Sequence, residues 1–128
     1  MELSDFNFEV EIRCPKSPTE DKETLVHCIS NVFPKTKWEF KGDKVVGKSK
    51  YLTRFKKILE DMRIRDTARK YMKDRVVDSK CSFSISKQAT CSAKVNFSQE
   101  EKPLGDLEVK IICDDIDALI ENITETEE

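Results

Sequence analysis

The sequence predicts a single α+β domain in which a mainly antiparallel sheet carries its helices on one face. Some stretches alternate apolar and polar residues, which is typical of a strand buried on one side. Others repeat apolar residues every three or four positions, which is typical of a helix packed on one side. Short polar connections favour hairpins, and hairpins give antiparallel pairs. The 128 residues suit one domain over residues 1–124, in the order βα-ββ-αα-ββ-β-α, with residues 125–128 as a frayed acidic tail.

The first third predicts a strand, a helix and a hairpin. Residues 6–14 alternate Phe, Val, Ile and Cys with polar neighbours and predict the strand. The segment 17–20, Ser-Pro-Thr-Glu, supplies an N-cap, a proline at the first helical position and a capping-box glutamate, so a helix is expected to begin there. Pro34 ends this helix, because proline cannot continue its hydrogen bonds. Trp38 and Phe40 alternate with charged neighbours, and an apolar run resumes at Val45 after a turn at residues 41–44, which predicts the hairpin.

The middle of the chain predicts two helices. Apolar residues recur at helical spacing from about Ser49 to Met62. Asp66 can cap a third helix, which extends toward Val76. A break near residues 63–65 separates the two, although they could also form one bent helix.

A second hairpin is expected beyond these helices. Residues 81–85 and 91–97 both alternate apolar and polar side chains, with a turn at residues 87–90. The polar positions of the expected strands are mainly Ser, Glu and Lys, so the uncovered face of the sheet is expected to be polar.

The last third predicts one more strand and a closing helix. Pro103 and Gly105 mark a turn, and residues 107–113 alternate as a strand. The acidic run 114–117 could bind a divalent cation through its carboxylates. A simpler role is to cap the closing helix and complement its dipole, so no metal site is expected.

The cysteines predict a reduced core and an intracellular setting. Their number is odd, and the chain has no Cys-x-x-Cys pair, so neither a disulfide framework nor a zinc site is expected. Four lie in phase with apolar strand residues and one on an apolar helix face: Cys14, Cys28, Cys81, Cys91 and Cys113. The chain has no apolar stretch of about 18 residues and no secretory leader, so we expect a cytoplasmic protein that does not span a membrane.

The sequence offers no recognisable active site. His27 is the only histidine, and no activated nucleophile accompanies it. The three glycines are too scattered to form a phosphate-binding loop. We therefore expect no enzymatic activity and no cofactor.

Positive charge is concentrated in the middle of the chain. Residues 35–75 hold fifteen Lys or Arg against six Asp or Glu, whereas residues 98–128 hold eleven acids against two lysines. A basic segment with interleaved aromatics is typical of a nucleic-acid-binding surface. The alternative is a solvated lattice in which basic and acidic stretches face each other. The residues expected to contact RNA are Lys35, Lys37, Lys41, Lys44, Lys48, Lys50, Arg54, Lys57, Arg65, Arg69 and Lys87.

Two of these cations have an alternative role that the sequence leaves open. Arg65 and Arg69 lie four residues apart on one helix face and could grip successive phosphates. They could equally pair with Asp61, Asp66 or Asp74.

Four segments together resemble a known family. They are Ile64-Arg65-Asp66-Thr67-Ala68-Arg69, Phe83-Ser84-Ile85-Ser86-Lys87-Gln88-Ala89, Lys94-Val95-Asn96-Phe97 and Pro103-Leu104-Gly105-Asp106-Leu107. In order and spacing they resemble an archaeal family of small uncharacterised proteins to which RNA binding is attributed. The resemblance implies a fold like the ribosomal protein that binds 5S rRNA, and no catalytic residues. The sequence departs from the family pattern at Thr90-Cys91-Ser92-Ala93, which concerns the second hairpin.

Two functional hypotheses follow. The first is a non-catalytic RNA-binding protein that holds the backbone of structured RNA through the basic hairpin and the middle helices. The second is a protein-interaction or assembly module whose acidic C-terminal third docks on a basic partner, including a second copy of itself in a homodimer.

Overall fold

The computed structural model describes residues 3–98 and 106–125, whose strands form one six-stranded sheet. The elements are η1 (Leu3–Asp5), β1 (Phe8–Pro15), α1 (Lys22–Ser30), β2 (Lys37–Lys41), β3 (Lys44–Ser49), α2 (Thr53–Asp61), α3 (Arg65–Lys73), β4 (Val76–Val77), β5 (Lys80–Ile85), α4 (Lys87–Thr90), β6 (Leu107–Cys113) and α5 (Ile116–Ile123). The strand order is β2-β3-β1-β6-β5-β4, and every neighbouring pair is antiparallel.

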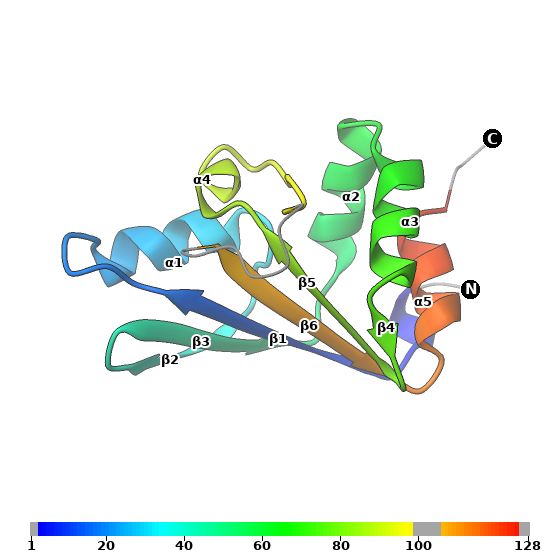
Figure 1. The fold of residues 1–128 in the computed structure, drawn as a ribbon, viewed down its shortest axis with the longest axis horizontal. Helices are drawn as coiled ribbons and strands as arrows, with labels where there is room; N and C mark the ends of the chain where they lie inside the picture. Colours follow the sequence, from blue (N-terminus) through cyan, green and yellow to red (C-terminus); the bar gives the residue numbers. More distant parts are fainter. Residues whose placement is uncertain (1–2, 99–105, 126–128) are drawn as a thin grey trace.

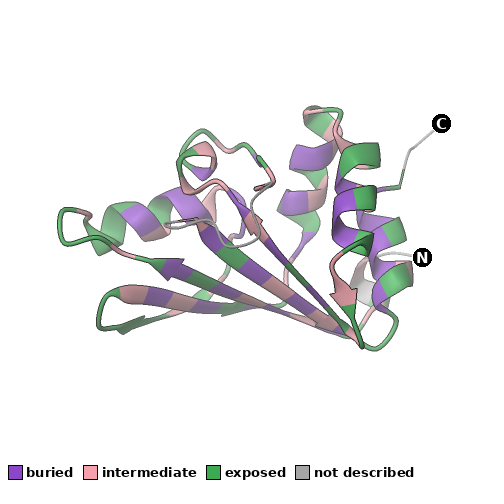
Figure 2. Cartoon of the chain, in the orientation of Figure 1, coloured by how far each residue is buried: buried purple, intermediate pink, exposed green. Residues whose placement is uncertain are grey.

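The helices lie on one side of this sheet, as the sequence predicts (Figure 1). Buried and solvent-facing residues alternate along β1, β5 and β6, so each of these strands buries one side and shows the other to solvent (Figure 2). The core lies between the sheet and the helices. At its centre the rings of Phe33, Phe55 and Phe83 stack, with centroids 5.5 and 5.9 Å apart. The α+β class is therefore confirmed, and one face of the sheet is left uncovered.

The first hairpin, β2–β3, owes its shape to two glycines. Gly42 has a φ of 62° in the connecting turn, a conformation that suits glycine. Gly47 lies opposite Trp38, and a Cβ at this position would come within 2.6 Å of Thr36 and 2.7 Å of the Trp38 ring. Glycine therefore lets the indole cross the strand on the helix-covered side.

The start of α1 differs from the prediction. The helix begins at Lys22, with the Asp21 side chain accepting a hydrogen bond from the Glu23 amide. The expected capping box closes a separate turn instead, because the Ser17 amide donates to Glu20 Oε1 at 2.8 Å and the Glu20 amide donates to the Ser17 carbonyl at 3.0 Å.

The prediction of a second hairpin is wrong. Residues 87–90 form the short helix α4, and of the described residues 91–98 only Phe97 pairs with β5, through an isolated bridge to Ile85. Local capping explains the helix, since Ser86 Oγ accepts from the Ala89 amide at 3.3 Å. β5 lies between β4 and β6 in the sheet. β6 begins 22 residues after β5 ends, and this long-range pairing has no local sequence signal.

The ends of the later helices also differ in detail from the sequence prediction. Helices α2 and α3 are separate, with Arg63 in a left-handed conformation of φ 58° between them. Asp66 lies in the first turn of α3 and does not cap it. Val76 belongs to strand β4. Asp115 holds the N-cap position of α5 without a side-chain capping hydrogen bond.

Two expectations lie outside the described residues: the turn at Pro103 and Gly105, and the fraying of residues 126–128. In the described ranges 3–98 and 106–125, no helix is long and apolar enough to cross a membrane.

The cysteines are not all reduced, which corrects the sequence prediction. Cys28 on α1 and Cys91 just after α4 form a disulfide, 63 residues apart in sequence. Cys14, Cys81 and Cys113 are buried free thiols. Burial raises the pKa of Cys14 to about 11 and that of Cys81 to about 12, so both thiols stay protonated and unreactive at neutral pH.

Candidate nucleic-acid interface

The uncovered face of the β2–β3 hairpin carries four lysines. Lys37 lies opposite Lys48, and Lys41 lies opposite Lys44. Their strand neighbour Val45 is buried on the helix side, and side chains alternate along a strand, so these four point to the uncovered side. The register thus gathers them on one surface, with Glu39 between the two pairs.

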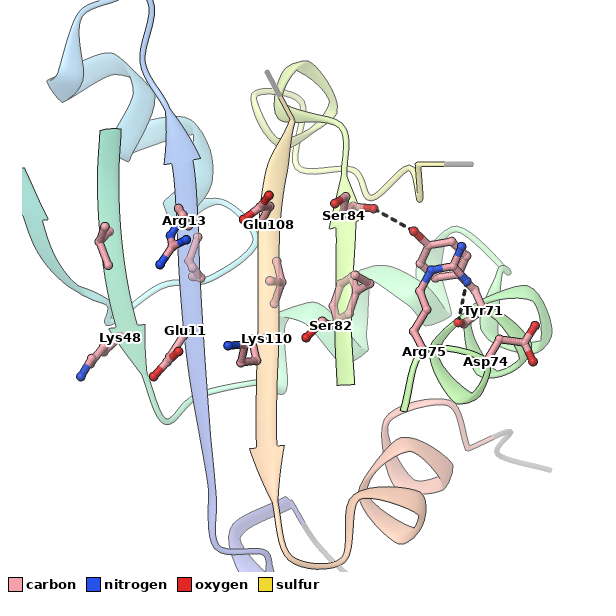
Figure 3. Close-up of a pocket in the computed structure, with 14 residues that line it drawn as sticks. Glu11, Arg13, Lys48, Tyr71, Asp74, Arg75, Ser82, Ser84, Glu108 and Lys110 are labelled. Carbon is pink, nitrogen blue, oxygen red and sulfur yellow. Dashed lines mark hydrogen bonds between the residues drawn. The ribbon is translucent and has the colours of Figure 1, made fainter. Parts of the chain in front are cut away.

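A hollow of about 920 Å³ adjoins these lysines on the uncovered face (Figure 3). Strands β1, β3, β5 and β6 supply its floor, and the end of α3 and the residues after it supply a wall. The polar side chains that line it are Glu11, Arg13, Lys48, Tyr71, Asp74, Arg75, Ser82, Ser84, Glu108 and Lys110.

Charges alternate across the floor of the hollow. Glu11 lies between Lys48 of β3 and Lys110 of β6, while Arg13 lies opposite Glu108. In the part of the chain that the structure describes, Arg13, Lys48 and Lys110 form no ion pair. These three cations are therefore available to an anionic ligand, although carboxylates lie beside them.

Arg75 and Tyr71 form the wall of the hollow beside β5. The guanidinium carbon of Arg75 lies 3.5 Å from the centroid of the Tyr71 ring, and Nη1 donates to the Tyr71 carbonyl at 3.0 Å. The Tyr71 hydroxyl donates to the Ser98 carbonyl at 2.7 Å and lies 3.3 Å from that of Ser84 (Figure 3). Both side chains are thus fixed in place.

Arg65 and Arg69 bind the C-terminal segment of their own chain. Arg69 Nη2 donates to the Thr124 carbonyl at 2.8 Å and Nε donates to the Thr124 hydroxyl at 3.1 Å. Arg65 Nη1 donates to the Glu125 carbonyl at 3.1 Å. Arg69 also pairs with Glu121 at 3.6 Å. These contacts favour a structural role for both arginines.

Lys87 is also engaged within the fold. Its ammonium group donates to Glu20 Oε1 at 2.8 Å and to the Pro15 carbonyl at 3.1 Å. The hydrogen bond from Lys87, followed by that from the Ser17 amide, lowers the pKa of Glu20. Lys87 therefore ties the loop before α1 to α4.

The remaining expected cations lie outside strands β2 and β3. Lys35 lies over the Tyr51 ring at 4.8 Å, and Lys50 is exposed just beyond β3. On α2, Arg54 donates to the Asn31 carbonyl and Lys57 pairs with Asp61 at 3.3 Å. Of the residues predicted to bind RNA, only Lys48 also lines the hollow.

Sequence reasoning missed Arg13, Arg75 and Lys110. Arg13 and Lys110 occupy polar positions of alternating strands, which places them on the uncovered face. Their nearness to each other depends on the β1–β6 register, and the stacking of Arg75 depends on the fold around α3.

Among the residues the structure places, no three His, Cys, Asp or Glu side chains gather in a cluster that could hold a metal ion. His27 is exposed on α1.

No family model matches the chain. It is 38% identical over 116 residues to a UPF0201 protein of Methanothermobacter thermautotrophicus, covering 88% of each chain. It is 34% identical over 128 residues to a UPF0201 protein of Sulfurisphaera tokodaii, covering 91% of this chain and 83% of that protein.

Solved structures agree in fold. The crystal structure of a UPF0201 protein from Methanococcus jannaschii has a TM-score of 0.83 at 30% identity, covering 94% of this chain and 95% of the other. A DUF54 protein from Archaeoglobus fulgidus, AF2318, has a TM-score of 0.65 at 17% identity, covering 93% and 97%, and is alike in fold alone. The chain belongs to the archaeal UPF0201 family.

Proposed function

We propose that this protein is a non-catalytic RNA-binding protein whose site is the uncovered face of the sheet. The observation that carries the proposal is the gathering of Lys37, Lys41, Lys44 and Lys48 on one exposed surface. Lysine ammonium groups are compact donors that bind phosphates as point charges. The hairpin is therefore suited to hold a nucleic-acid backbone.

The neighbouring strands extend this positive surface. Arg13, Lys80 and Lys110 lie on the same face, so cations outnumber the carboxylates there, which are Glu9, Glu11, Glu39 and Glu108. The carboxylates on this face repel the RNA backbone and limit how closely it can follow the sheet. The hairpin therefore makes the main phosphate contacts. Four such contacts correspond to a slope of log affinity against log salt of about −3 to −4.

A charge-removal experiment tests the proposal. Lys41, Lys44 and Lys48 are changed together to Gln, and the matched control changes Lys57, Lys70 and Lys94 to Gln, which removes the same charge from other surfaces. The affinity of total archaeal RNA is measured by polarisation over a range of salt. The hairpin variant should bind more weakly, with a slope shallower by roughly 2 to 3, while the control keeps most of its affinity. Equal losses in both variants would remove the hairpin from the site.

The wider expectations stay predictions. The resemblance noted in the sequence supports an RNA-related role, a cytoplasmic setting and a likeness to the ribosomal protein that binds 5S rRNA. The uncovered basic hairpin is consistent with the first of these.

The assembly hypothesis is the weaker proposal. It requires free acids in the C-terminal third, but Glu121 on α5 is already paired with Arg69 and Lys73 of α3. Sedimentation at low and high salt tests it, because an electrostatic homodimer should dissociate as salt screens its charges.

A further inference from the structure

The hollow beside the basic hairpin contains a planar cation that is held in place. Arg75 stacks on Tyr71 at 3.5 Å and is tethered through Nη1, and on its far side the Tyr71 ring packs against Phe97 with centroids 4.6 Å apart. Tyr71 covers one face of the Arg75 guanidinium. The other face and the outer edge of the guanidinium therefore face the hollow (Figure 3). Unpaired RNA bases stack on such guanidinium planes.

The size of the hollow suits a small planar ligand. Its volume of about 920 Å³ lies within the range of small-molecule sites. The hollow also continues across Lys110 of β6 and Arg13 of β1 to Lys48 of the hairpin. A nucleotide with its base at Arg75 would therefore have its phosphate on the side of the lysines.

The carboxylates of the hollow restrict what can lie there. Glu11, Asp74 and Glu108 would repel a phosphate group, but they can accept hydrogen bonds from the exocyclic amino group of a base. Ser82 and Ser84 can donate or accept at the base edge. This set of groups favours a base that carries an amino group over uracil, which has none.

We infer that the hollow binds one unpaired, amino-bearing nucleobase of the RNA, stacked on Arg75, while the lysines hold the adjoining backbone. The inference rests on the proposed function and adds base recognition to it.

The first test uses the unaltered protein and three probes of equal length. They are single-stranded oligocytidylate, oligouridylate and an abasic oligomer with the same phosphates. Oligocytidylate should bind roughly tenfold more tightly than the abasic oligomer, as expected for one stacked base. It should also bind more tightly than oligouridylate. Equal affinity for oligocytidylate and the abasic oligomer would overturn the inference, and equal affinity for cytidylate and uridylate would remove the role of the carboxylates.

A pair of variants then assigns the base to Arg75. Arg75→Lys keeps the charge and loses the plane, while Arg13→Lys makes the same change in the same hollow at a side chain that stacks on no described ring. Arg75→Lys should lose most of the difference between oligocytidylate and the abasic oligomer without weakening abasic binding, and Arg13→Lys should keep that difference. A difference that survives in folded Arg75→Lys protein would place the base elsewhere.

Failure of the inference differs from failure of the proposed function. If neither total archaeal RNA nor any of the probes binds, both are wrong. If all three bind equally and with the salt dependence of the hairpin lysines, the protein holds backbone alone and only the base site is wrong.

Discussion

Individual cations of this protein differ in what they contact, and this separates structural from functional candidates. The side chains of Arg65, Arg69 and Lys87 donate to oxygen atoms of their own chain at 2.8 to 3.1 Å. In the described ranges, Lys44 and Lys48 have no such partner. The sequence predicts all five as RNA contacts, but only the fold shows which ones are already engaged.

The Glu20–Lys87 pair predicts a pH dependence of stability. The pKa of Glu20 is lowered in the folded state, so the pair stabilises the fold fully above the ordinary glutamate pKa, and this contribution is lost as the pH falls through the lowered value. Lys87→Met should lower the free energy of unfolding by up to about 1 kcal/mol at neutral pH and by less in acid. Urea unfolding at neutral pH and below about pH 4 measures both values. The exposed Lys94→Met is the control, and an equal loss at both pH values would contradict the assignment.

Replacing Arg69 should lower the stability of the fold without weakening RNA binding. Replacing it by Gln removes charged hydrogen bonds to the Thr124 carbonyl and hydroxyl, which should lower the free energy of unfolding by roughly 1.5 to 3 kcal/mol. Lys70→Gln removes the same charge from the next, exposed position and should cost little. If Arg69→Gln instead keeps its stability and changes the salt slope of RNA binding, Arg69 belongs to the interface.

Among the helices and strands, the sequence predicts those whose signals lie in neighbouring residues. The alternation in β1 and β6 and the glycine turn of β2–β3 are local, and these strands form as predicted. Helix α4 was missed because its signal is a single capping serine, Ser86, which competes with an alternating pattern. Strand β4 is two residues long and has too few positions to show alternation.

The link between α1 and α4 could not be predicted because it joins distant elements. Cys28 and Cys91 have Cα atoms 4.2 Å apart, and nothing near either cysteine in the sequence indicates the other. The register that puts Lys110 beside Glu11 is likewise a long-range property. For this reason the sequence predicts the basic hairpin but not the hollow beside it.

The disulfide predicts a redox-dependent stability. A crosslink between residues 63 positions apart lowers the entropy of the unfolded chain, which corresponds to about 4 kcal/mol of stabilisation. Dithiothreitol should therefore lower the melting temperature of the wild-type protein. The double variant Cys28→Ser, Cys91→Ser should melt at the temperature of the reduced wild-type protein, with or without dithiothreitol. An unchanged wild-type melting temperature on full reduction would show that the bond contributes no stability.

The whole molecule has two unlike faces. One face of the sheet is covered by helices and closes the core, and the other is uncovered, with the β2–β3 hairpin at one edge (Figure 1). The uncovered face carries the hairpin lysines. The positive segment of the sequence is divided between the two faces. The helix cations Arg65 and Arg69 hold the C-terminal segment, while the hairpin lysines and the cations of the hollow remain on the open side.

Lysine acetylation with and without RNA tests this division most directly. The reagent modifies exposed ammonium groups, and mass spectrometry reports each lysine separately. RNA should protect Lys37, Lys41, Lys44, Lys48 and Lys110 on the open face, and it should leave Lys57, Lys70 and Lys94 as reactive as in the free protein. Protection of the last three, or no difference between the two sets, would contradict the assignment of the open sheet face as the RNA-binding surface.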